Sequence, residues 1–192
     1  MTYFHRAALL LTLLLCPLCR TVSAADTERA EISFEGRTYQ YTFVARMKGD
    51  ARAVHAVVTD FEHMKRINDD IVESRVLHRY ENGELKRLLK LRHCILLFCF
   101  DMDFVERVSE SPGRITTTMV PEESTFSDGT ANWQIEALED GHTRISVSAR
   151  QTPRFWIPPV LGPIVLKRVF MSEVAETCAN IERIVNAGYH RG

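Results

Sequence analysis

The chain has 192 residues, of which 45% are hydrophobic and 26% are charged, as is typical of one ordinary globular domain. Its formal charge is −1 at pH 7, and removal of residues 1–24 leaves 22 basic and 25 acidic side chains, a charge of −3. Neither value gives the strong positive field that nucleic-acid binding needs, so we expect no nucleic-acid partner.

Residues 1–24 have the three-part layout of a secretory signal peptide. A short basic start at 5–6 precedes an apolar run at 7–15, and small residues at 22–24 offer a cleavage site. The run is too short to cross a membrane as a helix. We therefore expect a periplasmic or secreted protein that is cleaved near Ala24, with residues 25–192 as its domain. The alternative is that this segment stays attached as an uncleaved anchor.

Three of the five cysteines, Cys94, Cys99 and Cys178, lie beyond this segment. An odd number leaves at least one thiol free and excludes a disulfide-dense scaffold. Cys94 and Cys99 are an odd number of positions apart, so a flat strand would point them to opposite faces. A pair involving Cys178 stays open, but we expect all three to be small buried hydrophobes.

The mature chain begins with a half-buried strand and two short helices. Alternating polar and apolar residues predict a strand that ends at Lys48, with Glu35-Gly36 as a turn before it. Asp50 is placed to cap a helix over 51–61, and a second short helix should end near Asn68.

The pattern from Ile71 to Ala149 predicts an antiparallel meander. Asn82-Gly83 is a strong hairpin signal, and further turns are expected at 111–113, 121–123 and 140–141. The apolar run at 95–100 breaks the alternation, and it fits either an exposed lip or a strand buried on both faces.

A long helix closes the chain. Residues 164–187 contain neither Pro nor Gly, Pro163 suits a first helical turn, and Gly188 should end the helix. One apolar stripe repeats at helical spacing, at positions 166, 169, 170, 174, 178, 181 and 185.

These elements predict an α+β fold. A curved antiparallel sheet of about six to seven strands would grip the long C-terminal helix, with two short helices after the first strand. Because one helix cannot fill the whole curve, we expect an apolar cavity between helix and sheet.

This order of elements resembles the START-like helix-grip superfamily, also called SRPBCC or Bet v 1-like. The segment V-x-x-V-V-T-D-F at 54–61 is similar to the start of the helical corner in that group, and F-W-I-P-P-V-L-G-P-I-V-L-K-R at 155–168 to the entry of its last helix. The resemblance covers residues 31–187 and is strongest to the polyketide cyclase/dehydrase-type and coenzyme Q-binding branches. It implies binding of hydrophobic small molecules such as lipids, sterols, quinones or polyketides, and only some members are enzymes.

Inward-facing strand and helix positions, together with the Pro-rich segment at 155–161 beside the expected cavity, give a set of candidate ligand contacts. They are Tyr41, Leu91, His93, Phe104, Trp133, Phe155, Trp156, Leu161, Phe170 and Val174. His93 and Arg87 share the inward parity of Leu91, although a hydrogen-bonded His93 and a solvent-facing Arg87 are the simpler interpretations. No catalytic motif, zinc-spaced set or phosphate loop is present, so we predict no catalytic residue, metal site or cofactor.

The Pro-rich segment Phe155–Leu161 holds six large apolar residues that cannot all be core. Most of them could pack under the helix start, or the segment could form a lip that touches a membrane to collect ligand. We rank three functions: an exported carrier of a hydrophobic molecule, a cyclase- or dehydratase-like enzyme that uses His93 or Arg87, and a module that docks a protein through this lip.

Overall fold

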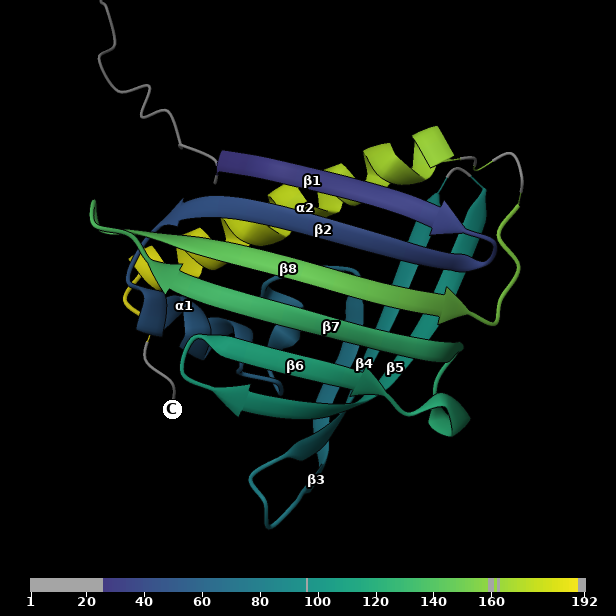
Figure 1. Cartoon of the computed structure of the whole chain (residues 1–192), viewed down its shortest axis with the longest axis horizontal. Helices are drawn as coiled ribbons and strands as arrows, with labels where there is room; N and C mark the ends of the chain where they lie inside the picture. The colour runs from purple at the N-terminus through teal and green to yellow at the C-terminus, as the bar shows by residue number, and fades with distance from the viewer. Residues whose placement is uncertain (1–25, 96, 159–160, 162, 190–192) are drawn as a thin grey trace, which may run out of the picture.

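The computed structural model describes residues 26–95, 97–158, 161 and 163–189. The expected signal peptide at 1–24, with Cys16 and Cys19, lies outside these residues, as does Val160 of the lip. The described chain forms an α+β fold in which helices cover one face of a large antiparallel sheet (Figure 1). Among these residues, no helix is both long and apolar enough to cross a membrane.

The sheet has eight strands in the order β1-β2-β8-β7-β6-β5-β4-β3. Their bounds are β1 Asp26–Glu35, β2 Thr38–Lys48, β3 Ile71–Arg79, β4 Leu85–Ile95, β5 Phe98–Ser111, β6 Arg114–Met119, β7 Phe126–Ala137 and β8 His142–Pro153. All neighbouring strands pair antiparallel.

The strand that the sequence analysis missed is β1, so the predicted count of about six to seven was slightly low. It turns at Gly36, whose φ is 60°, and pairs with β2 along its length. Ile32 and Phe34 are half-buried while their neighbours are exposed, so the alternation that predicts a strand was present before the turn.

The sheet bends sharply along β5. The first part of this strand, 98–108, pairs with β4, whereas 106–111 pairs with β6. Figure 1 accordingly shows β3, β4 and β5 running steeply across the direction of the other strands. The bend makes one face concave, and that face carries the helices.

The turns between the meander strands follow the predicted signals. Gly83, Gly113 and Gly141 all have positive φ, at 85°, 72° and 77°. Gly113 is also fixed by space, because a Cβ at this position would lie 2.8 Å from the carbonyl oxygen of Ile135. The expected turn at 121–123 is a short 3₁₀ helix, η2 (Pro121–Glu123).

The short helices fill the corner after β2. The side chain of Asp50 caps α1 (Ala51–Val58) by accepting hydrogen bonds from two backbone amides of the first turn, and Val54, Val57 and Val58 are buried. The second expected helix is a single 3₁₀ turn, η1 (Met64–Arg66).

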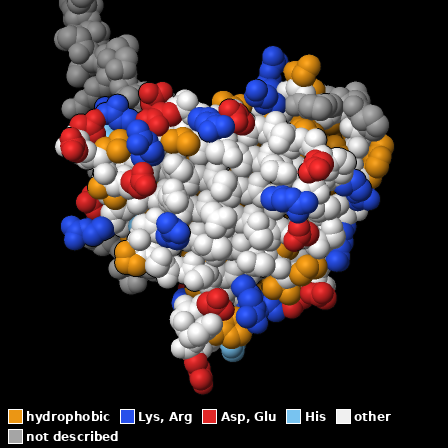
Figure 2. Space-filling view, in the orientation of Figure 1, with side chains coloured by type: hydrophobic (Ala, Val, Ile, Leu, Met, Phe, Trp, Pro, Cys, Tyr) orange, Lys and Arg blue, Asp and Glu red, His pale blue; other side chains and the backbone are white. Residues whose placement is uncertain are grey.

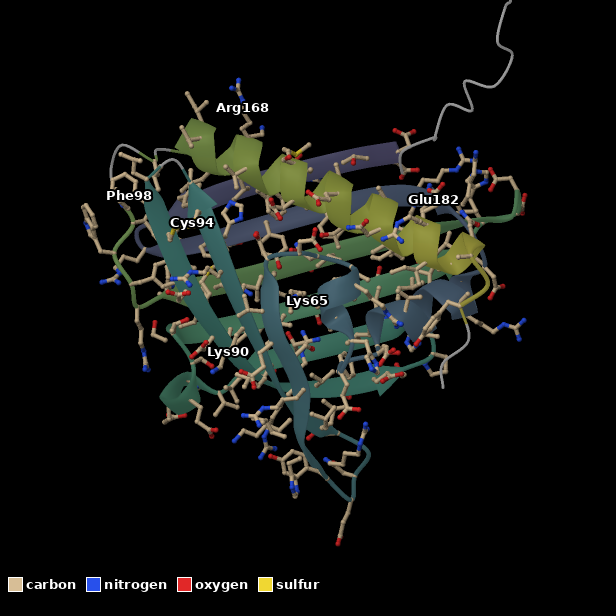
Figure 3. All side chains as sticks on the ribbon, turned by 180° about the vertical axis from the view of Figure 1, so that it is seen from behind. Lys65, Lys90, Cys94, Phe98, Arg168 and Glu182 are labelled. Atoms are coloured by element: carbon tan, nitrogen blue, oxygen red, sulfur yellow. A yellow bond between two sulfur atoms is a disulfide. The ribbon has the colours of Figure 1, made fainter. Side chains whose placement is uncertain are left out.

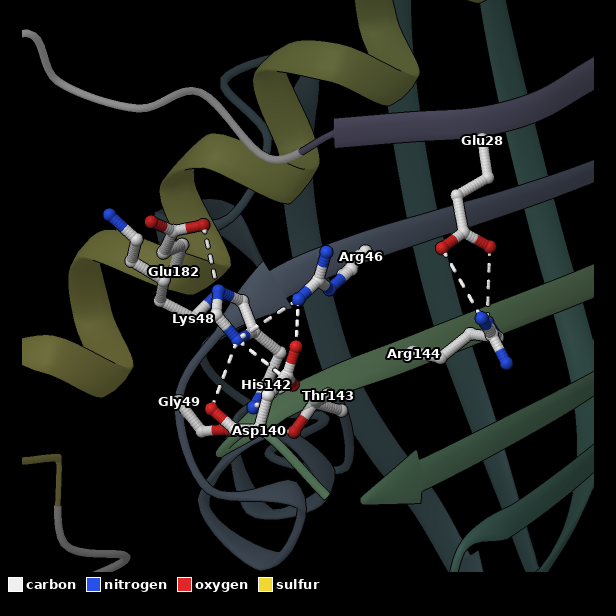
Figure 4. A network of polar contacts seen from close by, with 9 residues as sticks. All are labelled: Glu28, Arg46, Lys48, Gly49, Asp140, His142, Thr143, Arg144 and Glu182. Carbon is white, nitrogen blue, oxygen red and sulfur yellow. Dashed lines mark hydrogen bonds and ion pairs between the residues drawn. The ribbon is translucent and has the colours of Figure 1, made fainter. Parts of the chain in front are cut away.

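The long helix α2 (Pro163–Asn186) begins at the predicted proline and ends before Gly188, whose φ is 82°. Four residues from the middle of the helix onward, Val174, Cys178, Ile181 and Val185, are buried in the core. In the polar network of Figure 4, the backbone amide of Lys48 donates to Glu182 over 3.2 Å. The C-terminal half of α2 is therefore fixed to β2 by packing and by a hydrogen bond.

Cys94 and Cys99 form a disulfide across the β4–β5 hairpin, so the expectation that both are buried hydrophobes was wrong. The parity argument assumed one continuous strand, but the chain reverses between the two residues, which face each other in register. Cys178 is a buried free thiol, as expected, and burial raises its pKa to about 12. The run at 95–100 is a hairpin end with Leu97 96% exposed, not a strand buried on both faces.

Arg87 is buried rather than solvent-facing, which corrects the simpler sequence interpretation. It pairs across the strands with Glu106, and both its Nε and an Nη donate to one carboxylate oxygen, over 2.9 and 2.7 Å. The other oxygen accepts a hydrogen bond from Thr117, and the Phe61 ring lies 5.0 Å from the guanidinium. Because the partners satisfy each other, this ion pair can exist inside the protein.

We predict that Arg87→Met lowers the free energy of unfolding by about 3–5 kcal/mol, because it leaves the Glu106 carboxylate buried without a cation. Urea unfolding at neutral pH measures the change. The double variant Arg87→Met/Glu106→Leu should recover most of the loss, since it removes both charges. A single variant as stable as the wild type would contradict this account of the pair.

Candidate functional site: an apolar cavity with an acidic wall

A cavity of about 250 Å³ lies between the N-terminal half of α2 and the concave face of the sheet. It is partly open to solvent, and most of its walls are apolar. The lining residues come from several parts of the fold. They are β1 and β2 (Ile32, Phe34, Tyr39), the loop before β3 (Asn68, Asp70), β4 (Leu91, His93, Ile95), β5 (Phe100, Met102), the segment before α2 (Phe155, Ile157) and α2 (Leu166, Val169, Phe170, Glu173).

One apolar stripe of α2 serves both the core and the cavity. Its later members, from Val174 to Val185, are buried in the core. Its earlier members, Leu166, Val169 and Phe170, line the cavity and are only partly buried. The change from core to cavity therefore occurs near the middle of α2, between Glu173 and Val174.

Four of the ten predicted ligand contacts line this cavity: Leu91, His93, Phe155 and Phe170. Leu91, His93 and Phe170 face the cavity as their positions on β4 and α2 predict, and Phe155 reaches it from the segment before α2. The role of all four in ligand binding stays a prediction.

The other six predicted contacts lie elsewhere. Tyr41 packs behind the wall, with its ring centroid 4.9 Å from that of Phe170. Phe104 packs on Phe126, Trp133 packs on Phe43, and Val174 is part of the core. Leu161 is fully buried and Trp156 is 70% exposed. Inward parity selects all residues on a face, and it does not distinguish those in the core from those at a void.

Two phenols beside the cavity stay protonated. Burial raises the pKa values of Tyr39 and Tyr41 well above the ordinary tyrosine value. The Tyr39 hydroxyl, which belongs to a lining residue, donates to the side-chain oxygen of Gln151. Tyr39 therefore offers the cavity an uncharged side chain, and Tyr41 adds no negative charge behind the wall.

The polar part of the wall is a cluster of Asp70, His93 and Glu173, which we call the acidic wall. Nδ1 of His93 is hydrogen-bonded to Asp70 Oδ2, so the ring donates its Nδ1 proton to that carboxylate. Oε1 of Glu173 lies 3.9 Å from the same nitrogen. Asn68 supports both acids, because its amide group donates to Glu173 and its side-chain oxygen accepts from the Asp70 backbone amide.

The two carboxylates of the acidic wall lack a strong counter-charge. Within the described part of the chain, neither forms an ion pair with Lys or Arg. Burial, followed by repulsion from Asp70, raises the pKa of Glu173 above the ordinary glutamate value, while His93 acts in the opposite direction.

The acidic wall is also the place where the described residues could hold a metal ion. Each of its three side chains offers one ligand atom, and these atoms lie within 4.8 Å of one another. An imidazole nitrogen with two carboxylate oxygens is a donor set that suits several divalent transition metals. Acidic groups at surfaces are common without an ion, so this geometry permits a metal without requiring one.

Two members of the acidic wall were missed from sequence. Asp70 sits at the turn before β3, and its side chain reaches His93, a contact between distant residues that no local sequence pattern indicates. Glu173 follows Val169 and Phe170 by four and three positions, so it lies on the face that lines the cavity. A charged residue inside an apolar stripe is the signal that would have found it.

Phe155 and Ile157 of the segment Phe155–Leu161 line the cavity at the end where α2 starts. Phe155 lines the cavity and two neighbouring hollows of about 430 and 480 Å³, and its ring packs on Phe100 with 5.6 Å between centroids. The predicted lip is therefore mixed: Pro158 and Leu161 are buried, while Trp156 faces solvent. Figure 3 shows Cys94 and Phe98 at this same end, near the start of α2, with Glu182 toward the other end.

We predict that Glu173→Gln raises the thermal unfolding midpoint at pH 7.5. A carboxyl with a raised folded pKa destabilises the fold while it is ionised, and this cost disappears as the pH falls through that pKa toward the unfolded value of about 4.3. The advantage of the variant should therefore shrink as the pH is lowered toward 4.3. Thermal melts across this range, with the exposed Glu139→Gln as the control, measure it. An advantage that grows on acidification would refute the assignment.

The fold occurs in solved structures of low sequence identity. A START superfamily protein from Mycobacterium smegmatis is 19% identical, with a TM-score of 0.60 over 77% of this chain and 97% of that chain. The Zhui aromatase/cyclase of a Streptomyces species is 16% identical, with a TM-score of 0.61 over 80% and 99%. A STAR-related lipid transfer protein from Xanthomonas axonopodis is 13% identical, with a TM-score of 0.58 over 79% and 98%.

These likenesses show that the fold is START-like, in agreement with the resemblance found in the sequence. No curated protein is similar enough to this chain to count as a match. The model of the family described as "Polyketide cyclase / dehydrase and lipid transport" matches residues 47–173, which is most of the chain. The protein therefore belongs to the polyketide cyclase/dehydrase and lipid transport family.

Proposed function

We propose that this protein is an exported carrier that holds a hydrophobic small molecule, such as a lipid or a quinone, between α2 and the sheet. The observation that carries the proposal is the cavity of about 250 Å³ with mostly apolar walls. A well-packed protein interior leaves few voids of this size, and burial of an apolar ligand in such a void is favourable. The family and the fold support the class of ligand, because solved structures of this fold include a lipid transfer protein and an aromatase/cyclase.

The Cys94–Cys99 disulfide supports export, because such bonds form and persist mainly in oxidising compartments. We infer that the leader at 1–24 directs the chain to the periplasm or the outside and is cleaved near Ala24. We expect no nucleic-acid partner: on the face seen in Figure 2, acidic and basic side chains are interspersed and neither sign forms a large patch.

We also propose that the mouth of the cavity touches a membrane to exchange ligand. Three large apolar side chains are well exposed at this end of the molecule: Leu97 at 96%, Trp156 at 70% and Ile164 at 82%. Exposed basic side chains, Lys167 and Arg168, follow Ile164 on α2. Apolar residues beside basic ones suit the surface of an anionic bilayer. Docking of a protein partner on the same residues is the alternative.

One observation favours an enzyme as the second candidate. Asp70 holds the His93 ring at the cavity wall through Nδ1, and Nε2 has no hydrogen-bond partner among the described residues. An imidazole oriented by a carboxylate in this way can act as a general acid or base. Arg87, the other predicted candidate, is occupied by Glu106 and does not line the cavity.

The first test is native mass spectrometry of the protein as the expressing cell exports it. We expect a chain that has lost its first 24 residues and that carries one apolar molecule, which denaturation releases for identification. Cavity-filling Val169→Trp should lose this molecule, because the new ring would project from a lining position. Ala175→Trp, at an exposed position of the same helix, is the matched control.

The outcomes of this experiment separate the candidates. Equal loading of the wild type and Val169→Trp would overturn the carrier proposal. Recovery of a chemically altered ligand from the wild type, and of the unaltered ligand from His93→Ala, would favour the enzyme.

We predict that Leu97→Ser and Trp156→Ser each weaken binding to phosphatidylcholine vesicles that contain phosphatidylglycerol by about tenfold, since each removes an apolar side chain of roughly 1.5–3 kcal/mol. Co-sedimentation measures the binding. Val72→Ser, which changes another exposed apolar residue on β3, is the control and should have no effect. Vesicle binding that neither variant reduces would refute membrane contact at this end.

A further inference from the structure

The cavity has one chemically distinct side. Its other walls are formed by aliphatic and aromatic side chains, whereas the acidic wall places two carboxylates and an imidazole against the void. The three residues come from different elements: Asp70 precedes β3, His93 lies on β4, and Glu173 lies on α2. A ligand in the cavity therefore meets hydrocarbon on most sides and an anionic surface on one.

The charge of this surface is not cancelled within the described structure. His93 is the only basic side chain in ion-pairing distance of either carboxylate among the described residues. Even a protonated imidazole offsets only one of the two negative charges. The contrast with Glu106 is clear, since that carboxylate is buried against the guanidinium of Arg87. A half-buried pair of carboxylates repel each other, and a cation between them would relieve this repulsion.

We propose that the cavity selects apolar ligands whose polar end is an ammonium group, with Asp70 and Glu173 as the residues that bind it. The inference rests on the proposed carrier function and adds the chemical class of the ligand's polar end. An ammonium group offers several N–H donors and a positive charge, which match two carboxylates that can only accept. The apolar part of the ligand would lie along Leu91, Val169 and the other hydrocarbon walls.

The same arrangement disfavours anionic ligands. A carboxylate or phosphate at this end would face two like charges in partly desolvated surroundings, and like charges placed together are costly. A neutral alcohol could donate one hydrogen bond and would lie between the two cases. The acidic wall thus ranks ligands of equal apolar length by the charge of their polar end.

Three probes with one alkyl chain test this ranking: octylammonium, octanol and octanoate. The amine and the acid are fully charged at neutral pH, so the polar end is the only variable. Displacement of the neutral apolar dye N-phenylnaphthylamine from the signal-cleaved protein measures each affinity. EDTA is present throughout, so that no metal ion occupies the acidic wall. We expect octylammonium to bind at least about tenfold more tightly than octanoate, because one charge-assisted hydrogen bond contributes a difference of that size.

Variants assign the preference to its residues. The double change Asp70→Asn/Glu173→Gln should remove the preference for the amine over the acid, because neither amide side chain carries a charge. Asp69→Asn and Glu176→Gln, which alter exposed acids next to the same elements, should keep the preference. A preference that survives in the double variant would overturn the assignment to Asp70 and Glu173.

The outcomes also separate this inference from the carrier proposal. Equal affinity for the three probes, or tighter binding of octanoate, would overturn the selection for ammonium while the carrier function stands. Failure of the dye and of all three probes to bind would overturn both. Dye binding that Val169→Trp does not reduce would show that the probes occupy another site, which also counts against the inference.

Discussion

The architecture depends on a mismatch between one helix and a bent sheet. Eight strands curve through β5, and a single helix about 10–12 Å wide cannot follow the whole concave face. At one end α1 fills the remaining space, and Val174, Cys178, Ile181 and Val185 meet a closed core. At the other end nothing comparable is present among the described residues, so the same helix stripe faces a void. The cavity is thus a direct result of placing one helix, with a short partner at one end only, on this sheet.

Two glutamates illustrate the difference between a charge that is neutralised inside the fold and a charge that is free to bind a ligand. They are the buried Glu106 and the half-buried Glu173. Glu106 is deep in the fold, and Arg87 and Thr117 satisfy it completely. Glu173 lies at the cavity wall, where its neighbours are an amide, an imidazole and a second acid. A satisfied pair has little left to offer a ligand, whereas an unsatisfied one retains binding capacity at some cost in stability. This difference, rather than proximity to the void alone, is why the acidic wall and not Arg87 is the candidate anchor.

Much of the fold could be predicted from the sequence because its signals are local. Periodicity, Asp50 and the glycine turns gave α1, the meander and α2, and the alternation along β4 placed Leu91 and His93 inward. The errors have a common origin in contacts between distant residues. Parity cannot show that the chain reverses between Cys94 and Cys99, that Glu106 lies across from Arg87, or that Asp70 and Glu173 converge on His93. The position of the void depends on how the side chains fill the space between helix and sheet. Sequence patterns alone therefore could not show that Phe170 lines the cavity whereas Trp133 packs against the core.

The strand order has a consequence for how the chain folds. The second strand in the sequence pairs with the last, and its Tyr39 lies across from Gln151, 112 residues later. Contacts between such distant residues must wait for a large loop to close, which makes folding slow. Until β8 is available, β1 and β2 can pair only with each other, and a two-stranded hairpin alone is marginally stable in water. The sheet therefore cannot be completed before nearly the whole chain has been synthesised. Under the export that we propose, in which the chain would cross a membrane unfolded, this delay would be an advantage.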